Sequence, residues 1–194
     1  MQPATFPSIF KSKQAETDFH TCYRDYLSLW AIPNEQHVIH TRQGDTFVVA
    51  SGPKEAPPLV LLHGTMANAG AWMSEVITWA KEFRVYAVDI IGDAGLSAPV
   101  RPSFTTDAHA LWLSDLLEGL GVPRASLIGT SLGGGVALDF AIRRPEQVES
   151  LVLLCPGGVA NKNVLLWALP LLLLGSWGAR NVQERILGKV PRRS

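Results

Sequence analysis

The residues best suited to do chemistry in this sequence run from Gly129 to Gly133 and read Gly-Thr-Ser-Leu-Gly. A serine hydroxyl is a weak nucleophile at neutral pH. A hydrolytic enzyme therefore presents it on an exposed sharp turn, beside a base and beside donors for the developing oxyanion. Small residues around Ser131 allow a strand to turn abruptly into a helix, whose positive end then faces the hydroxyl. The pattern predicts Ser131 as a nucleophile.

The segments on either side of Ser131 supply the context that this motif requires. The apolar run 125–128 is typical of a strand, and 132–143 is typical of a helix that ends before Pro145. Gly134 and Gly135 extend the run of small residues, so the start of this helix can pack closely against the strands. Because Gly-x-Ser-x-Gly also occurs by chance, the order strand, turn, helix is what makes the interpretation specific.

Two further motifs follow strand-like runs. His63-Gly64-Thr65 comes directly after the apolar run 59–62, where a backbone N–H could help to hold an oxyanion. The second motif spans Asp89 to Ser97 and follows the run 84–88. The carboxyl ends of parallel strands are where α/β proteins place their ligands, so we expect these motifs to lie near Ser131.

The surrounding pattern shows which elements position these motifs. An amphipathic helix is expected over 13–30, and a β-hairpin over 37–50 with its turn at 42–45. Beyond Pro57-Pro58, short apolar strands alternate with helical stretches, which is typical of a parallel sheet wrapped by helices. The expected strands are 59–62, 84–88, 125–128 and 151–154, and the expected helices are 71–81, 106–119 and 132–143.

The three motifs, in this order and at strand ends, resemble the α/β-hydrolase superfamily, in its capped serine-esterase branch. The resemblance covers residues 36–158. It implies an α/β-hydrolase fold with a mostly parallel sheet, an N-terminal antiparallel hairpin and helices on both faces, incomplete at the C-terminus. We therefore expect an N-terminal helical extension over 1–35, the first part of the hydrolase core over 36–158, and the start of a truncated helical cap over 159–194.

The resemblance also implies roles for individual residues. Ser131 would be the nucleophile, the backbone N–H groups of Leu132 and Thr65 would form the oxyanion hole, and Met66 would be a reserve donor. His63 is expected to shape its loop rather than to transfer protons, and Ser97 to brace the loop after its strand. The residues expected to shape the site are His63, Gly64, Asp89, Gly129 and Gly133.

The sequence departs from the family in the acid and the base. The family's triad runs in the order Ser, Asp or Glu, and His. The histidines, which all precede Ser131, are His20, His37, His40, His63 and His109. The carboxylates after Ser131 are Asp139, Glu146, Glu149 and Glu184, and none directly follows an expected strand. His109 is the one non-motif histidine of the α/β part, near a helix start, and we do not expect it to replace the base.

The resemblance therefore implies a serine hydrolase of carboxylesterase type that acts on a small ester through an acyl-serine intermediate. Without its base this chain is expected to be nearly inert, since loss of the base costs several orders of magnitude in rate. The alternative is a non-catalytic fragment or a degenerate pseudo-enzyme that retains the fold. A serine at this turn argues against haloalkane or epoxide chemistry, whereas lactonase, haloperoxidase-like and carbon–carbon-bond hydrolase activities stay open. Substrate identity and oligomeric state stay open as well.

Composition narrows the class of partner. The 194 residues are 47% hydrophobic and carry 17 basic and 17 acidic side chains, which argues against disorder and against nucleic-acid binding. We expect a small-molecule partner and neither a metal nor an organic cofactor. Cys22 and Cys155 are isolated and are expected to be buried. Residues 1–13 lack an apolar signal core, so a cytoplasmic protein is expected. The apolar stretch 164–174 is shorter than the roughly 20 residues of a membrane span, and a buried helix is expected there.

Overall fold

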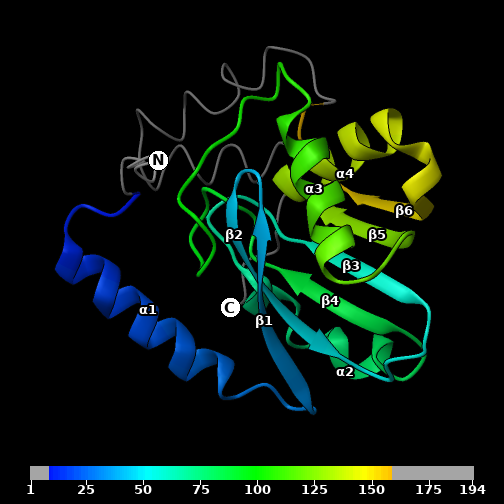
Figure 1. Ribbon diagram of the computed structural model, residues 1–194. Coiled ribbons are helices and arrows are strands. Elements are labelled where there is room, and N and C mark those ends of the chain that lie inside the picture. Colours follow the sequence, from blue (N-terminus) through cyan, green and yellow to red (C-terminus); the bar gives the residue numbers. More distant parts are fainter. Residues whose placement is uncertain (1–8, 159–194) are drawn as a thin grey trace, which may run out of the picture. The chain divides into compact units, whose positions relative to one another are not determined.

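The computed structural model, which describes residues 9–158, contains a six-stranded sheet (Figure 1). The sheet order is β1-β2-β4-β3-β5-β6. The β1–β2 and β2–β4 pairs are antiparallel, and the other three pairs are parallel. The strands are β1 (Asn34–Thr41), β2 (Gly44–Ser51), β3 (Pro58–Leu62), β4 (Arg84–Val88), β5 (Ala125–Thr130) and β6 (Val148–Leu154). The predicted mostly parallel sheet with an N-terminal hairpin is confirmed.

Helices cover both faces of this sheet, as predicted (Figure 1). They are α1 (Lys13–Leu27), α2 (Val76–Trp79), α3 (Ala108–Gly119) and α4 (Leu132–Arg143), with 3₁₀ turns η1 (Ala69–Trp72) and η2 (Pro145–Gln147). Successive strand residues point to opposite faces. Val60 therefore packs with Trp112 of α3 and Phe140 of α4, whereas Leu61 packs with Leu27 of α1 and Val76 of α2. All six side chains are buried, so β3 is apolar on both faces.

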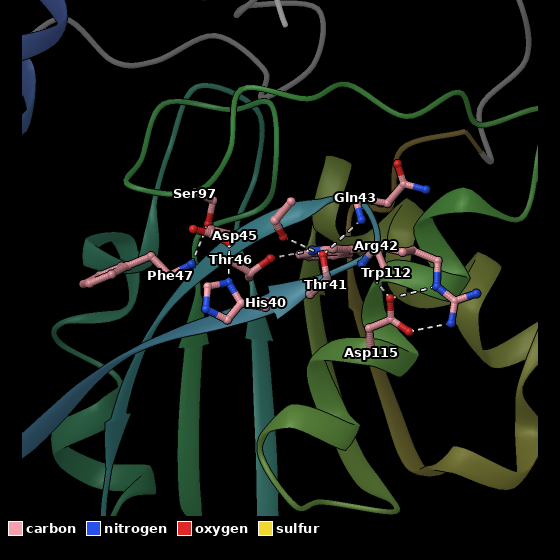
Figure 2. Close-up of polar contacts among 11 residues, drawn as sticks. His40, Thr41, Arg42, Gln43, Asp45, Thr46, Phe47, Ser97, Trp112 and Asp115 are labelled. Carbon is pink, nitrogen blue, oxygen red and sulfur yellow. Dashed lines mark hydrogen bonds and ion pairs between the residues drawn. The ribbon is translucent and has the colours of Figure 1, made fainter. Parts of the chain in front are cut away.

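The turn between β1 and β2 is fastened to α3 (Figure 2). The Arg42 guanidinium donates two hydrogen bonds to the Asp115 carboxylate, at 2.8 and 2.7 Å, and the Arg42 backbone N–H donates a third at 2.8 Å. Farther along the hairpin, the indole N–H of Trp112 donates to the Thr46 hydroxyl at 2.8 Å. These bonds tie the antiparallel part of the sheet to a helix of the parallel part.

The hairpin turn is shorter than the sequence predicts. Thr41 pairs with Gly44, so the connection consists of Arg42 and Gln43 alone rather than residues 42–45. Gly44 has a φ of 116°, a left-handed conformation that favours glycine, and it can therefore begin the second strand directly after the turn.

The prediction of one continuous helix over 71–81 is wrong. The segment consists of η1 and the four-residue α2. The Asn68 side chain accepts a hydrogen bond from the Gly70 N–H at 3.2 Å and so starts a 3₁₀ turn. The buried residues Ala69 and Trp72 follow the three-residue period of that turn, and their packing against the sheet overrides the helical pattern.

The predicted burial of both cysteines is also wrong, since Cys22 and Cys155 are exposed. Cys22 precedes the buried Tyr23 on α1 and lies outside the apolar stripe of that helix. Cys155 follows the end of β6 with a φ of 48°. The residue type alone therefore does not determine whether a cysteine faces the core or the solvent.

Some predictions concern residues outside those that the structure describes, and others are not tested by it. The cap over 159–194 and the buried helix over 164–174 lie outside the described residues, and the division at 35/36 and 158/159 stays a prediction. Within residues 9–158, no helix is both long and apolar enough to cross a bilayer. The cytoplasmic location stays a prediction.

Candidate active site

Ser131 occupies the corner between β5 and α4, with φ 50° and ψ −110°. A positive φ is unusual for a residue with a side chain and stores about 1–3 kcal/mol of strain. The Ser131 N–H donates to the Leu154 carbonyl at 2.9 Å, and the Ser131 carbonyl accepts from the Gly135 and Gly157 N–H groups at 3.0 and 2.6 Å. These bonds hold Ser131 at the end of the sheet, where it is exposed.

Close backbone approach explains the glycines beside Ser131. A Cβ atom on Gly133 would lie 2.2 Å from the Leu62 carbonyl oxygen, and one on Gly129 would lie 2.4 Å from the Gly133 carbonyl oxygen. The Gly133 N–H donates to the His63 carbonyl at 3.0 Å. The absence of side chains therefore lets the start of α4 contact the end of β3 directly. A Cβ on Gly64 would lie at ordinary contact distance, 3.5 Å, from the Ser131 Cβ.

The structure brings Thr65 and Leu132, the two expected oxyanion-hole residues, to one cavity of about 220 Å³. Leu132 is the first residue of α4, so its N–H has no acceptor within the helix. Within residues 9–158, neither the Thr65 N–H nor the Leu132 N–H donates a hydrogen bond. Two residues with unbonded backbone N–H groups thus line one cavity, and one of them, Leu132, directly follows Ser131 in the chain.

Met66, the expected reserve donor, is placed differently. Its N–H donates to the Asp93 carboxylate at 2.9 Å, and its side chain is 85% exposed. The φ of Met66 is 62°. The Asp93 carboxylate therefore fixes the turn after Thr65, and the Met66 N–H is already engaged.

His63 uses both ring nitrogens within its own surroundings. Its Nε2 accepts a hydrogen bond from the Ile90 N–H at 2.9 Å, so the ring proton lies on Nδ1, which donates to the Gly64 carbonyl at 2.8 Å. Burial lowers the pKa of His63 and keeps the ring neutral. With both nitrogens engaged, the ring joins the ends of β3 and β4, and neither nitrogen is free to move a proton.

Asp89 connects four segments at the end of β4. One carboxylate oxygen accepts from the Tyr23 hydroxyl at 2.8 Å and from the Ala69 N–H at 2.7 Å, and the other accepts from the Leu96 N–H at 2.8 Å. The Asp89 side chain is fully buried, and burial raises the pKa of its carboxyl group. Asp89 therefore acts as a brace on the loop that follows β3.

Sequence reasoning missed Tyr23, although it belongs to this brace. Burial is the main cause that raises the pKa of the Tyr23 hydroxyl, and the charge of Asp89 adds to it. Tyr23 lies on α1, 66 positions from its partner, so no local pattern joins the two. Ser97 adds a second brace, because its hydroxyl donates to the Asp89 carbonyl at 2.6 Å. The same hydroxyl accepts from the Phe47 N–H at 2.8 Å (Figure 2).

The described carboxylates after Ser131 show no sign of a triad acid. Asp139 pairs with Arg143 at 2.7 Å on α4, and Glu149 pairs with Arg124 at 2.9 Å. His109 lines the same cavity as Thr65 and Leu132, but the structure shows no hydrogen bond between His109 and Ser131 within residues 9–158. Among these residues, no cluster of His, Cys, Asp or Glu has the composition to hold a metal ion.

Two curated proteins are similar to this chain in sequence. The uncharacterized carboxylesterase nap of Bacillus subtilis is 43% identical over 138 residues, which cover 71% of this chain and 46% of that relative. Carboxylesterase YbfK of Bacillus subtilis is 41% identical over 147 residues, covering 76% and 50% respectively. This chain thus spans about half the length of these curated relatives.

Solved structures agree with the sequence comparison. The crystal structure of naproxen esterase (carboxylesterase NP) from Bacillus subtilis has a TM-score of 0.75 at 36% identity, covering 90% of this chain and 61% of that one. The crystal structure of carboxylesterase CesB (YbfK) has a TM-score of 0.72 at 37% identity, covering 92% and 63%. A family described as the alpha/beta hydrolase fold matches residues 57–182. The chain therefore belongs to the α/β-hydrolase family and is similar to its carboxylesterases.

Proposed function

We propose that this chain is the nucleophile-bearing part of a serine carboxylesterase that acts on small esters. The Ser131 Oγ attacks the ester carbonyl carbon, and the negative charge that develops on the carbonyl oxygen is held by the N–H groups of Thr65 and Leu132. Collapse of this intermediate breaks the bond to the alcohol and leaves an acyl-serine. Water then attacks the acyl-serine, releases the acid and restores the hydroxyl.

One observation carries the proposal. Ser131 lies exposed in a strained corner at the end of β5, next in the chain to Leu132, which lines one cavity together with Thr65, and neither of these two residues donates a backbone hydrogen bond within residues 9–158. Maintaining positive φ at a non-glycine residue costs free energy, and such strain gathers at functional sites. Met66 stays the reserve donor, and its use requires that Asp93 give up the bond it now accepts.

The proposal requires an acid and a base from outside these 194 residues. In the family's order both follow the nucleophile, whereas all five histidines here precede Ser131. The base takes the serine proton and returns it to the leaving alcohol, so both chemical steps need it. No metal or organic cofactor enters this mechanism. The finer proposal is that the 194-residue chain by itself is almost inactive.

The second candidate function is a non-catalytic protein that keeps the fold and its cavity without turnover. The position of every histidine before Ser131 favours it for this chain. The two candidates differ in one measurable property, which is whether Ser131 becomes reactive once an acid and a histidine are supplied.

Labelling with a fluorophosphonate tests this property. One sample is the 194-residue chain, and the other is a chimera in which this chain continues into the part of YbfK that follows its matched region. We expect rapid labelling of the chimera, none after Ser131→Ala, and labelling of the chain alone at least about a thousandfold more slowly. Rapid labelling that survives Ser131→Ala contradicts the proposed nucleophile. A folded chimera that stays unlabelled favours the non-catalytic candidate.

A further inference from the structure

The cavity beside Thr65 and Leu132 has a second wall that the proposed ester attack does not use. Much of its lining is apolar and includes Ile90, Ile91 and Pro102. Two nitrogen-rich side chains, Arg101 and His109, line the same cavity. Polar groups that converge on an otherwise apolar pocket fix the orientation of a ligand and select among ligands.

The His109 ring is held in one orientation. The residue is 4% exposed and lies in the first turn of α3. Its ring stacks on Phe104, with the centroids 4.2 Å apart and the planes 19° apart. The Nδ1 atom is enclosed and has no hydrogen-bond partner in the described part of the chain. Nε2 is therefore the ring nitrogen that can reach the cavity.

The position of the ring proton follows from this enclosure. A neutral imidazole carries one N–H and one lone pair. An N–H on Nδ1 would be buried without an acceptor, which is costly, whereas an N–H on Nε2 can bond to water or to a ligand in the cavity. Burial lowers the pKa of His109, so the neutral ring is the form present at neutral pH. His109 thus offers one donor to the cavity.

Two other polar side chains of this wall, Arg101 and Asp93, already make hydrogen bonds within the protein. The Arg101 Nε donates to the Gly92 carbonyl at 2.8 Å, which holds the guanidinium at the cavity. The Asp93 carboxylate already accepts two backbone N–H groups, each at 2.9 Å. The wall therefore presents donors from His109 and Arg101, beside a carboxylate whose Oδ1 already accepts these two hydrogen bonds.

We propose that the Nε2–H of His109 selects substrates by donating a hydrogen bond to an acceptor oxygen in the part of the ester that fills this cavity. The oxygen is an ether, a carbonyl or a carboxylate, at a position separate from the ester group that Ser131 attacks. The identity of the ligand as a substrate rests on the proposed function, whereas the binding itself requires no turnover. His109 is a specificity-determining residue in this proposal and takes no part in proton transfer.

Uncleavable amides test the proposal on the 194-residue chain. The probes are ω-methoxy amides of four to six carbons, straight-chain amides in which a methylene replaces the ether oxygen, and the matching dicarboxylic acid monoamides. Binding is followed by nitrogen-15 NMR of the histidine rings, which detects weak ligands. We expect an ether or a carboxylate probe to bind about tenfold more tightly than its methylene match and to shift the Nε2 signal of His109.

Matched variants assign the effect to one side chain. His109→Phe keeps a ring that stacks on Phe104 and removes the donor, so it should abolish the preference for oxygen-bearing probes. Ser131→Ala should keep that preference, which separates this proposal from the nucleophile assignment. Arg101→Gln removes the guanidinium and tests whether that group contributes to the affinity for an anionic probe. If the preference survives His109→Phe, the proposal is overturned.

The wild-type titration keeps the proposal falsifiable even where a variant fails to fold. Probes that bind without moving the Nε2 signal, or that bind equally well with and without the oxygen, overturn it. Failure of the fluorophosphonate experiment leaves this result untouched, because the amides are bound and not cleaved.

Discussion

Two turns meet at the carboxyl end of the sheet, and they are held in different ways. The corner at Ser131 is fixed by main-chain hydrogen bonds and by the close approach of Gly133 to β3. The loop after β3 is fixed instead by side chains, with Asp93 holding Met66 and Asp89 holding Ala69. An atom added between two closely packed backbones causes a large loss of stability in one step, whereas side-chain hydrogen bonds can be removed one at a time with smaller losses.

The largest effect is expected for Gly133→Ala. The added Cβ would lie 2.2 Å from a main-chain oxygen of β3, which cannot move without disturbing the sheet. We expect a loss of at least about 3 kcal/mol in the free energy of unfolding, measured by urea titration.

Gly121→Ala is the matched control for this prediction. Gly121 has a φ of 70°, and no atom lies within 4 Å of its would-be Cβ. Only the left-handed strain of about 1–2 kcal/mol remains at that position. Equal losses in the two variants would show that contact with β3 does not set the cost at the corner.

The second prediction concerns the side-chain brace. Asp89→Asn replaces a carboxylate oxygen with an NH₂ group that faces N–H donors, and we expect it to lower the free energy of unfolding by about 2 kcal/mol. Tyr23→Phe removes only one donor, and we expect it to lower the free energy of unfolding by about 1 kcal/mol. If Tyr23→Phe costs nothing, α1 does not support the loop after β3.

The Asp89 brace also has a pH signature. Because burial raises the pKa of Asp89, the folded chain binds this proton more tightly than the unfolded chain does. The contribution of Asp89 to stability is complete below the pKa of the unfolded chain and falls as the pH rises through the folded pKa. In Asp89→Asn, this decrease in stability between the two pKa values should be absent from urea titrations made across the acidic range.

The smallest effect is expected at Asp115, away from both turns. Hydrogen bonds from Arg42 lower the pKa of Asp115, so this contribution is present above the unfolded pKa and is lost as the pH falls through the folded pKa. Asp115→Asn should therefore remove a pH dependence of opposite sign to that of Asp89. We expect a loss of under about 1 kcal/mol at pH 7, because the pair is partly solvated.

The contrast between the turns also explains what could be predicted from the sequence. The helix Leu132–Arg143 and the strand Arg84–Val88 match their expected ranges, because periodicity and the glycine corner are local signals. The bonds Tyr23–Asp89 and Asp93–Met66 join residues 66 and 27 positions apart, and no spacing indicates them. The sharp corner at Ser131 could be predicted from the sequence, but the side chains that support the loop after β3 could not.

Local sequence patterns also could not predict features that depend on tertiary contacts. The break between η1 and α2 follows from packing against the sheet, which the spacing of apolar residues does not record. His109 gave no motif signal either. A lone histidine near a helix start becomes informative only once its neighbours across the cavity are known.

The backbone conformation of Ser131 lowers the stability of the fold, although the hydroxyl at this position is the group that the proposed reaction needs. A residue without a side chain would adopt φ 50° and ψ −110° with less strain, so Ser131→Gly relieves the corner while it removes the hydroxyl. Selection for thermal robustness alone would thus drive this position away from serine. At residue 131, the residue that would strain the fold least and the residue that the proposed reaction requires are therefore different.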